Sequence, residues 1–145
     1  PGLAGQYLRR AFLRHTLERC HPRVCIEFGT LLSKPDARLD EHVYVGPRCH
    51  LGLVHLERDV LLAAGVHIPS GGRIHGIDRL DVPIRKQPGE LHRVTVGEGS
   101  WIGERAVVLA DVGARSVVGA GAVVTRPVPD EVIVGGNPAE VIRER

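Results

Sequence analysis

Aliphatic residues recur in this chain at a spacing of about six, a period that fits neither an α-helix nor an alternating strand. The first run consists of Ile26, Leu32, Leu39, Val45, Leu51, Leu56, Leu62 and Ile68. The period resumes at Val96, Ile102 and Val108, and again at Val112, Val118 and Val124. A six-residue unit supplies one short strand and one turn, so it closes a core only when successive units stack. The period therefore predicts an all-β fold, a parallel β-helix.

Two further positions in each unit support this prediction. The residue after each aliphatic is often small or acidic, as at Asp40, Gly46 and Gly97, which suits a corner. Four places after the aliphatic stands another small or β-branched residue that can fill the remaining interior. These residues are Thr30, Val43, Cys49, Val60, Val66, Ser100, Ala106, Ser116 and Ala122. A sandwich of short strands would instead show alternation of period two and Asn-Gly hairpin turns, and the sequence has neither.

The period is irregular in two places. Asp36 falls in a slot that should face the interior, so either the first coil is irregular or its register is shifted. The step from Val108 to Val118 is ten residues where two full units need twelve. One corner is therefore expected to be shortened.

Composition limits the domain count and the class of partner. A chain of 145 residues can bury one core and is too short for two ordinary domains. The net charge of +2 comes from 19 basic and 17 acidic residues scattered along the chain, without the basic block typical of nucleic-acid binding. We therefore expect no nucleic-acid partner, while phosphate-bearing small ligands stay compatible with the charge.

Cysteine usage and apolar runs bear on the compartment. Cys20, Cys25 and Cys49 form an odd set without metal-ligand spacing, and no apolar run approaches the ~18 residues of a membrane span. These features predict a cytoplasmic protein without a metal and without integral membrane contact. The chain opens at Pro1 and contains no Met, from which we expect a processed or trimmed N-terminus.

The two ends of the chain lie outside the repeat. Residues 4–20 have the pattern of an amphipathic helix that would cap the open edge of the first coil. Its expected faces are Leu8, Phe12, Leu13 and Leu17 on one side and Arg9, Arg10, Arg14 and Arg19 outward. The expected organisation is one domain over 1–145, made of an N-terminal helical cap (1–22), first coils (23–68), an external loop (69–93), further coils (94–126) and a C-terminal tail (127–145) that caps the other end or crosses to a neighbour.

Two stretches carry a resemblance to a known family. Residues 94–145, VTVGEGSWIGERAVVLADVGARSVVGAGAVVTRPVPDEVIVGGNPAEVIRER, resemble the C-terminal half of hexapeptide-repeat acyltransferases. Residues 65–78, GVHIPSGGRIHGID, resemble the family segment in which a coil leads into the loop of the catalytic histidine. The relatives include maltose, galactoside and xenobiotic acetyltransferases, and the polysaccharide O-acetyltransferases are the most similar group. The resemblance implies a left-handed β-helix, a homotrimer, and acetyl-CoA bound in a groove between adjacent subunits.

Histidines are the candidate catalytic and acceptor-binding residues. Acetyl transfer to a hydroxyl needs a base that takes the proton near neutral pH, and imidazole suits this role. His75 lies in the non-repeating segment 69–93, and its HGID context matches the family, so we expect it to be the base. His50 and His67 each stand five places after an interior aliphatic and one coil apart, which predicts that they stack on one outer face. This face is either an acceptor-binding or base-orienting surface or an ordinary polar ladder. Asp59 falls near the family's acceptor-contacting position.

The donor residues are expected near the end of the stack. Trp101, the only tryptophan, occupies an outward position, which suggests a place in the CoA groove or at a subunit seam. By resemblance, the pantetheine and phosphate path is lined by Gly103, Glu104, Ala120, Thr125 and Arg126, with Arg143 near the nucleotide. Arg126 keeps the charge of a lysine common in relatives, whereas Glu140 stands where some of them have a basic residue.

Two alternatives remain open from the sequence. His50, His55 and His67 suggest a γ-type carbonic anhydrase with Zn²⁺ on the same fold, although His50 and His55 can project from different faces. A non-catalytic trimeric scaffold is the second. In the preferred interpretation the acceptor is a small molecule, first of all a sugar hydroxyl on a saccharide precursor.

Overall fold

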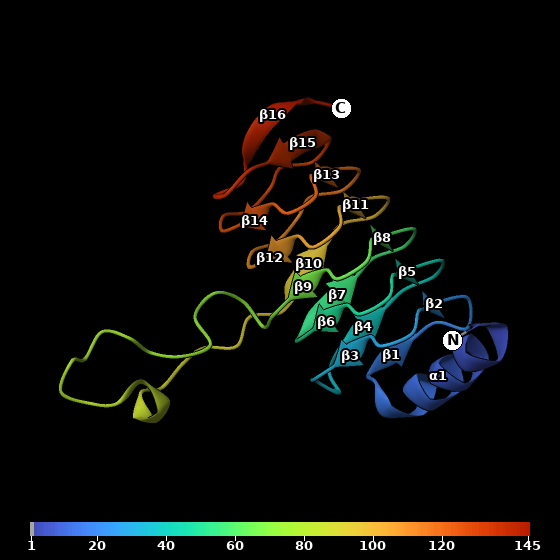
Figure 1. The fold of residues 1–145 in the computed structure, drawn as a ribbon, viewed down its shortest axis with the longest axis horizontal. Helices are drawn as coiled ribbons and strands as arrows, with labels where there is room; N and C mark the ends of the chain where they lie inside the picture. Colours follow the sequence, from blue (N-terminus) through green and yellow to red (C-terminus); the bar gives the residue numbers. More distant parts are fainter. Residues whose placement is uncertain (1) are drawn as a thin grey trace.

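The structure is a computed structural model that describes residues 2–145, and it consists of three sheets wound into a β-helix behind one N-terminal helix (Figure 1). Sheet A contains β1 (Arg19–Cys20), β4 (Arg38–Leu39), β7 (Val54–Leu56) and β10 (Val94–Val96). Sheet B contains β2 (Cys25–Ile26), β5 (Tyr44–Val45), β8 (Leu61–Leu62), β11 (Trp101–Ile102), β13 (Val117–Val118), β15 (Val132–Gly135) and β16 (Glu140–Glu144). Sheet C contains β3 (Leu31–Leu32), β6 (His50–Leu51), β9 (His67–Ile68), β12 (Val107–Val108) and β14 (Val123–Val124). Each coil passes through A, B and C in turn, which confirms the predicted parallel β-helix.

The interior is the aliphatic column that the period predicted. The second residue of each two-residue strand points inward, and Val45, Leu62 and Ile102 are completely buried on sheet B. The smaller residues four places later are also buried, except Thr30, which is half-buried. Ser100 and Ser116 lie in this core with satisfied hydroxyl groups, because each donates a hydrogen bond of 2.7 Å to a carbonyl oxygen one coil further on. Small polar fillers are therefore tolerated where the next coil supplies an acceptor.

The two irregularities have local explanations. Asp36 is exposed, and the neighbouring Ala37 fills the interior instead, so the assignment of Asp36 to an interior slot was wrong by one residue. The shortened corner lies between sheets C and A, where Val108 is followed by Val112 only four residues later. Val112 forms single bridges to Val96 and Val128 in place of a strand, because the short corner leaves no room for more.

The helix α1 (Gly2–Thr16) differs from its prediction in extent and in orientation. It ends before residue 20 because the backbone of residues 18–21 pairs with the next coil and forms β1. Leu13 and Leu17 pack against the core as expected, but Leu8 and Phe12 are 72% and 67% exposed. Arg9 is turned inward instead, and its Nε donates a hydrogen bond of 2.9 Å to the carbonyl of Ile26. The open edge of the first coil exposes such carbonyls, and a polar side chain can donate a hydrogen bond to them, which an apolar one cannot. Within residues 2–145, no helix has both the length and the apolar character needed to cross a membrane.

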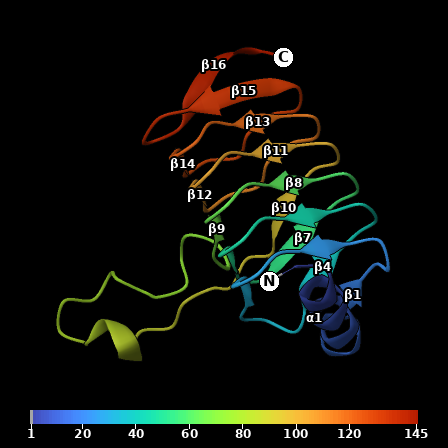
Figure 2. The same cartoon turned by 45° about the vertical axis from the view of Figure 1, so that its right-hand side comes forward.

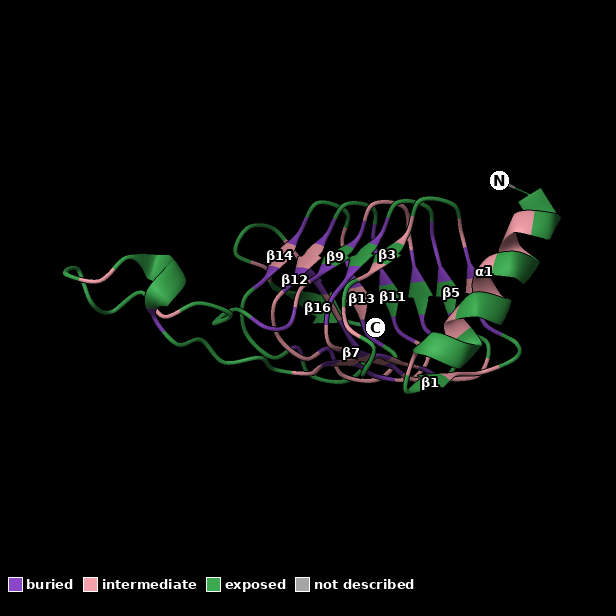
Figure 3. Cartoon of the chain, turned by 90° about the horizontal axis from the view of Figure 1, so that it is seen from below, coloured by how far each residue is buried: buried purple, intermediate pink, exposed green. Residues whose placement is uncertain are grey.

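Segment 69–93 leaves the stack between sheets C and A and projects from its side (Figures 1 and 3). It contains one short 3₁₀ helix, η1 (Ile84–Lys86). The stack continues across it without a gap, since β10 pairs directly with β7, Val94 beside Val54. At the far end, β15 stacks on β13 and β16 folds back antiparallel over it, opposite α1 (Figure 2).

Candidate functional site

Two histidines lie one above the other on the outer face of sheet C. His50 and His67 are the first residues of β6 and β9, so they point outward while Leu51 and Ile68 point into the core. Their rings meet edge to face with centroids 5.5 Å apart. The predicted stacking of the two histidines is therefore confirmed. His55 lies on β7 in sheet A, on a different face, where its Nε2 is 3.0 Å from a carboxylate oxygen of Asp40.

The loop that carries His75 is anchored by backbone contacts between its two arms. The backbone N–H of His92 donates a hydrogen bond of 2.9 Å to the carbonyl of Ser70, and that of Glu90 donates one of 2.8 Å to the carbonyl of Arg73. Further out, the arms cross so closely that a Cβ at Gly89 would overlap the backbone of Ile74 and His75. A Cβ at Gly76 would likewise meet the carbonyl of Pro88 at 2.5 Å. Glycine at both crossing points therefore lets the second arm support the backbone of His75.

Gln87 holds the outer part of the same loop. Its Oε1 accepts a hydrogen bond of 3.1 Å from the backbone N–H of Arg79, and its Nε2 donates to the carbonyls of Arg79 and Val82 at 2.7 and 2.8 Å. It is the only buried residue between positions 72 and 93 of the described chain. One amide side chain thus takes the place of an aliphatic core in this loop.

The three histidines meet in one cleft of about 410 Å³ between sheet C and the base of the loop. Its walls are formed by Ser33, Lys34, His50, Leu51, Gly52, His67, Pro69, Ser70, Ile74, His75, Leu91 and Val107. The wall residues Ser33, Gly52 and Pro69 were not predicted from the sequence, although all three directly follow an interior aliphatic at the end of a sheet C strand. That shared position was the signal that could have found them. Gly52 is required, because a Cβ there would lie 2.6 Å from the Oγ of Ser70.

His75 also borders a second hollow of about 300 Å³ inside the loop. This hollow is lined by Gly72, Arg73, His75, Gly76, Ile77, Asp78, Pro88, Gly89 and Glu90. The His75 residue is exposed, so its imidazole can be approached from the cleft and from the hollow. A group between two cavities can contact two different molecules at once.

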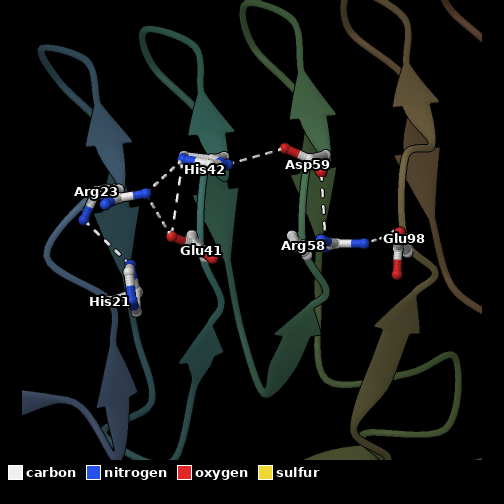
Figure 4. Close-up of polar contacts among 7 residues, drawn as sticks. All are labelled: His21, Arg23, Glu41, His42, Arg58, Asp59 and Glu98. Atoms are coloured by element: carbon white, nitrogen blue, oxygen red, sulfur yellow. Dashed lines mark hydrogen bonds and ion pairs between the residues drawn. The ribbon is translucent and has the colours of Figure 1, made fainter.

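Asp59 lies away from this cleft, at the corner between sheets A and B (Figure 4). One carboxylate oxygen is 3.2 Å from Nδ1 of His42 in the coil below, and the other is 3.7 Å from Nε of Arg58. Arg58 in turn reaches Glu98 in the next coil. Figure 4 shows these side chains in contact along the corner, from His42 through Asp59 and Arg58 to Glu98. Within one chain Asp59 therefore belongs to a surface charge row and not to the histidine site.

The predicted donor residues fall into separate groups within one chain. Gly103, Glu104 and Ala120 lie at the corner between sheets B and C, whereas Thr125 and Arg126 follow β14 at the corner between C and A. Both groups flank the part of sheet C that continues the histidine face, since β12 stacks on β9 and β14 stacks on β12. Trp101 is exposed on the outer face of sheet B, and Arg143 lies on β16.

The cysteines do not contribute a reactive thiol to the cleft. Cys49 is buried, and its Sγ lies 3.2 Å from the carbonyl oxygen of Ala63. Burial raises the pKa of the Cys49 thiol, and it does the same for Cys20 and Cys25. A raised pKa lowers the thiolate fraction that an acyl-enzyme would need. Within residues 2–145, no three His, Cys, Asp or Glu side chains are grouped as metal ligands would be.

Sequence comparison identifies the repeat and its relatives. Residues 93–126 match the family model of the hexapeptide repeat of succinyl-transferase. Galactoside O-acetyltransferase of Escherichia coli K12 is 28% identical over 99% of this chain and 81% of its own length. A putative lipopolysaccharide biosynthesis O-acetyl transferase of the same organism is 26% identical over 80% of this chain and 61% of its own length.

Structure comparison gives the same fold. The crystal structure of a maltose O-acetyltransferase from Clostridium difficile 630 covers 99% of this chain and 78% of its own, with a TM-score of 0.85 and 21% identity. A hexapeptide-repeat acetyltransferase from Vibrio cholerae, solved with acetyl coenzyme A, covers 95% of this chain and 76% of its own, with a TM-score of 0.79 and 22% identity.

Proposed function

Because this chain is a hexapeptide-repeat protein with O-acetyltransferases among its relatives, we propose that it transfers an acetyl group from acetyl-CoA to a hydroxyl, with His75 as general base. The observation that carries the proposal is the cleft in which His75 faces His50 and His67. Packing of the stack brings His50 and His67 together, but it does not require that the external loop place His75 beside them. A positioned base at a cleft that admits the acceptor is what hydroxyl acylation needs.

In the proposed reaction, the acceptor hydroxyl lies in the cleft and donates its hydrogen bond to a neutral His75. As the oxygen attacks the thioester carbonyl, the imidazole takes its proton and a tetrahedral oxyanion forms. The oxyanion collapses, the C–S bond breaks, and the CoA thiolate receives the proton from the imidazolium. Acetyl ester and CoA thiol leave, and His75 is neutral again. His50 and His67 bind the acceptor, because both line the cleft that His75 lines and both stand on strands of sheet C.

The donor path runs up sheet C from the cleft. Gly103 suits the donor path, because a side chain there would collide with the backbone of Ala120 in the next coil. This corner therefore offers backbone groups, and no side chain of residue 103, to the donor. Arg126 suits the CoA phosphates, since its exposed guanidinium makes no side-chain hydrogen bond or ion pair within residues 2–145. Thr125 and Glu104 border the same stretch, and Arg143 lies on β16, in the C-terminal hairpin of sheet B.

We further propose that the protein is a homotrimer. The outward residues of sheet B form an apolar column of Cys25, Tyr44, Leu61, Trp101, Val117 and Ile133, whereas those of sheet A are mainly polar, namely Arg19, Arg38, His55 and Thr95. A contiguous apolar column on one face is typical of a protein contact. Trp101 lies on a different sheet from the donor path, so it reaches a CoA groove only from a neighbouring copy. The projecting loop adds exposed apolar side chains at Ile77, Leu80 and Ile84 that suit the same contact.

The acceptor we propose is a sugar hydroxyl of a saccharide precursor, as the names of the galactoside, maltose and lipopolysaccharide relatives suggest. The cleft surface is mainly apolar, and Ser33, Lys34 and the histidines add polar groups to it, a mixture that suits the apolar faces and the hydroxyl groups of a sugar. Asp59 would contribute only if a neighbouring copy brought its corner to the cleft. Incubation with acetyl-CoA and a panel of sugars, amino acids and aminoglycosides, followed by mass spectrometry of the products, identifies the acceptor.

The catalytic proposal is tested with His75→Ala. We expect turnover to fall by about 10²–10⁴-fold with acetyl-CoA affinity nearly unchanged, the usual loss when a positioned base is removed. His67→Ala is the matched variant from the same cleft, and it should raise the KM for the acceptor more than it lowers kcat. Full turnover in His75→Ala together with none in His67→Ala would show that the base is His67 and not His75. Turnover unaffected by either change would remove the proposed mechanism.

A further inference from the structure

The outward face of α1 is apolar and uncovered. Its exposed side chains over three turns are Leu3, Ala4, Tyr7, Leu8, Ala11 and Phe12, which span about half the circumference at ~3.6 residues per turn. Leu3 and Tyr7 are 74% and 64% exposed, similar to Leu8 and Phe12. Four large apolar side chains on one exposed helix face form the kind of patch that marks a binding surface.

The inner face of the helix already performs the capping of the first coil. Leu13 packs against the core, Arg9 binds the Ile26 carbonyl, and Nε2 of Gln6 donates to Glu27. An amphipathic helix that only capped the solenoid would turn its apolar side inward. Here Leu13 and two polar side chains hold the helix in place, and the larger apolar face points away from the protein.

Charge decides which partner this face suits. Residues 2–40, which contain α1 and the first coil, carry seven Lys or Arg and four Asp or Glu, a net charge of +3. The remaining residues 41–145 carry twelve basic and thirteen acidic residues, a net charge of −1. The helix itself has three arginines and no acidic residue. Two copies meeting through this end would bring like charges together, whereas an anionic surface would be attracted to it.

We propose that α1 is an interfacial anchor that binds the surface of an anionic phospholipid bilayer. Leu3, Leu8 and Phe12 enter the boundary between headgroups and acyl chains, and Tyr7 lies at headgroup level. Arg14, exposed at the end of the same face, and Arg10, whose guanidinium lies 4.8 Å from the centroid of the Tyr7 ring, meet the lipid phosphates. The helix lies on the membrane and does not span it, consistent with its 15 residues.

The position of α1 leaves the rest of the molecule free for catalysis. The helix covers the first coil at the opposite end from the β15–β16 hairpin, and the His75 loop projects from the side of the stack (Figures 1 and 2). Membrane binding is independent of the proposed acetyl transfer. If the trimer forms, its rotational symmetry presents three helices at one end, and their combined binding exceeds that of one.

The test is sedimentation with vesicles of phosphatidylcholine alone and of phosphatidylcholine mixed with phosphatidylglycerol, without substrates. We expect the full chain to bind the mixed vesicles, to bind phosphatidylcholine at least tenfold more weakly, and to be released as salt rises. Phe12→Glu should weaken binding at least tenfold, and Arg14→Gln should weaken it to a smaller extent. The matched control is Val141→Glu, because Val141 is 55% exposed on β16 at the other end of the stack.

Three results overturn the proposal. These are no binding to the anionic vesicles, equal losses for Phe12→Glu and Val141→Glu, and a smaller assembly mass for Phe12→Glu, which would make the face a contact between copies. Turnover of Phe12→Glu on a soluble acceptor is measured in parallel. Since Phe12 lines neither the histidine cleft nor the hollow beside it, that turnover should equal wild type, so failure of lipid binding and failure of the enzyme proposal are distinguished.

Discussion

Gly89→Ala tests whether the crossing of the two loop arms sets the position of His75. An added Cβ at Gly89 would lie 2.7 Å from the backbone nitrogen of His75 and closer still to the carbonyl of Ile74. Ordinary contact begins at 3.4 Å, so the backbone nitrogen of His75 must move by about 0.7 Å and the carbonyl of Ile74 by about 1.2 Å. A misplacement of roughly 1 Å can lower a rate about 10²-fold. We therefore expect turnover to fall between about tenfold and a hundredfold.

The assay compares kcat and the KM for acetyl-CoA in wild type, Gly89→Ala and Gly72→Ala. Gly72 is the matched control, because an added Cβ there would meet only the Cβ of Leu109, at an ordinary 3.7 Å. Both variants should melt at the wild-type temperature, since β7 and β10 close the stack beneath the loop. Wild-type turnover in Gly89→Ala, or equal losses in both variants, would refute the idea that this crossing positions the base.

Four further predictions address the loop, the donor path and the cysteines. Gln87→Glu should speed hydrogen exchange of residues 79–87 and lower turnover, because the carboxylate cannot donate to the two carbonyls that Nε2 holds. The control Arg79→Ala keeps those backbone contacts, so hydrogen exchange and turnover should both stay at the wild-type level. Trp101→Ala should weaken either CoA binding or assembly measured by sedimentation, and an unchanged result in both would make the exposed ring incidental. Arg126→Ala should reduce affinity for CoA more than for its 3′-dephosphorylated form, and equal losses would remove the phosphate role. Cys49→Ala should keep near wild-type turnover, because burial raises the pKa of that thiol; loss of activity in a normally folded variant would point to an acyl-enzyme.

The stack was predictable because one short pattern is repeated and each copy specifies the same local structure. A residue such as Leu62 lies between Val45 and Ile102 in adjacent coils, so its burial follows from its position in the period. The stacking of His50 on His67 follows from the same argument. An error such as that at Asp36 stays local, because a single extra residue in one corner is absorbed before the next strand begins.

The loop and the helix were less predictable because their contacts do not repeat. The role of Gln87 depends on three hydrogen bonds to two other loop residues, and a lone glutamine in a polar segment gives no indication of them. For α1, the helical pattern identified an apolar face but not the partner it meets. Burial was assigned to Leu8 and Phe12 on the assumption that the solenoid is that partner. The backbone carbonyls at the open coil edge instead favoured Arg9.

The direct pairing of β7 with β10 separates the stability of this fold from the chemistry of its site. Val54 and Val94 are neighbours in sheet A although the whole of segment 69–93 lies between them in the sequence. The aliphatic column therefore continues whether the loop is long or short, and elsewhere the same corner is closed by only three residues, those between Val108 and Val112. Changes within the loop can alter the walls around His75 without exposing the core. The regular coils fix where His50 and His67 stand, and the loop is free to determine which acceptor reaches them.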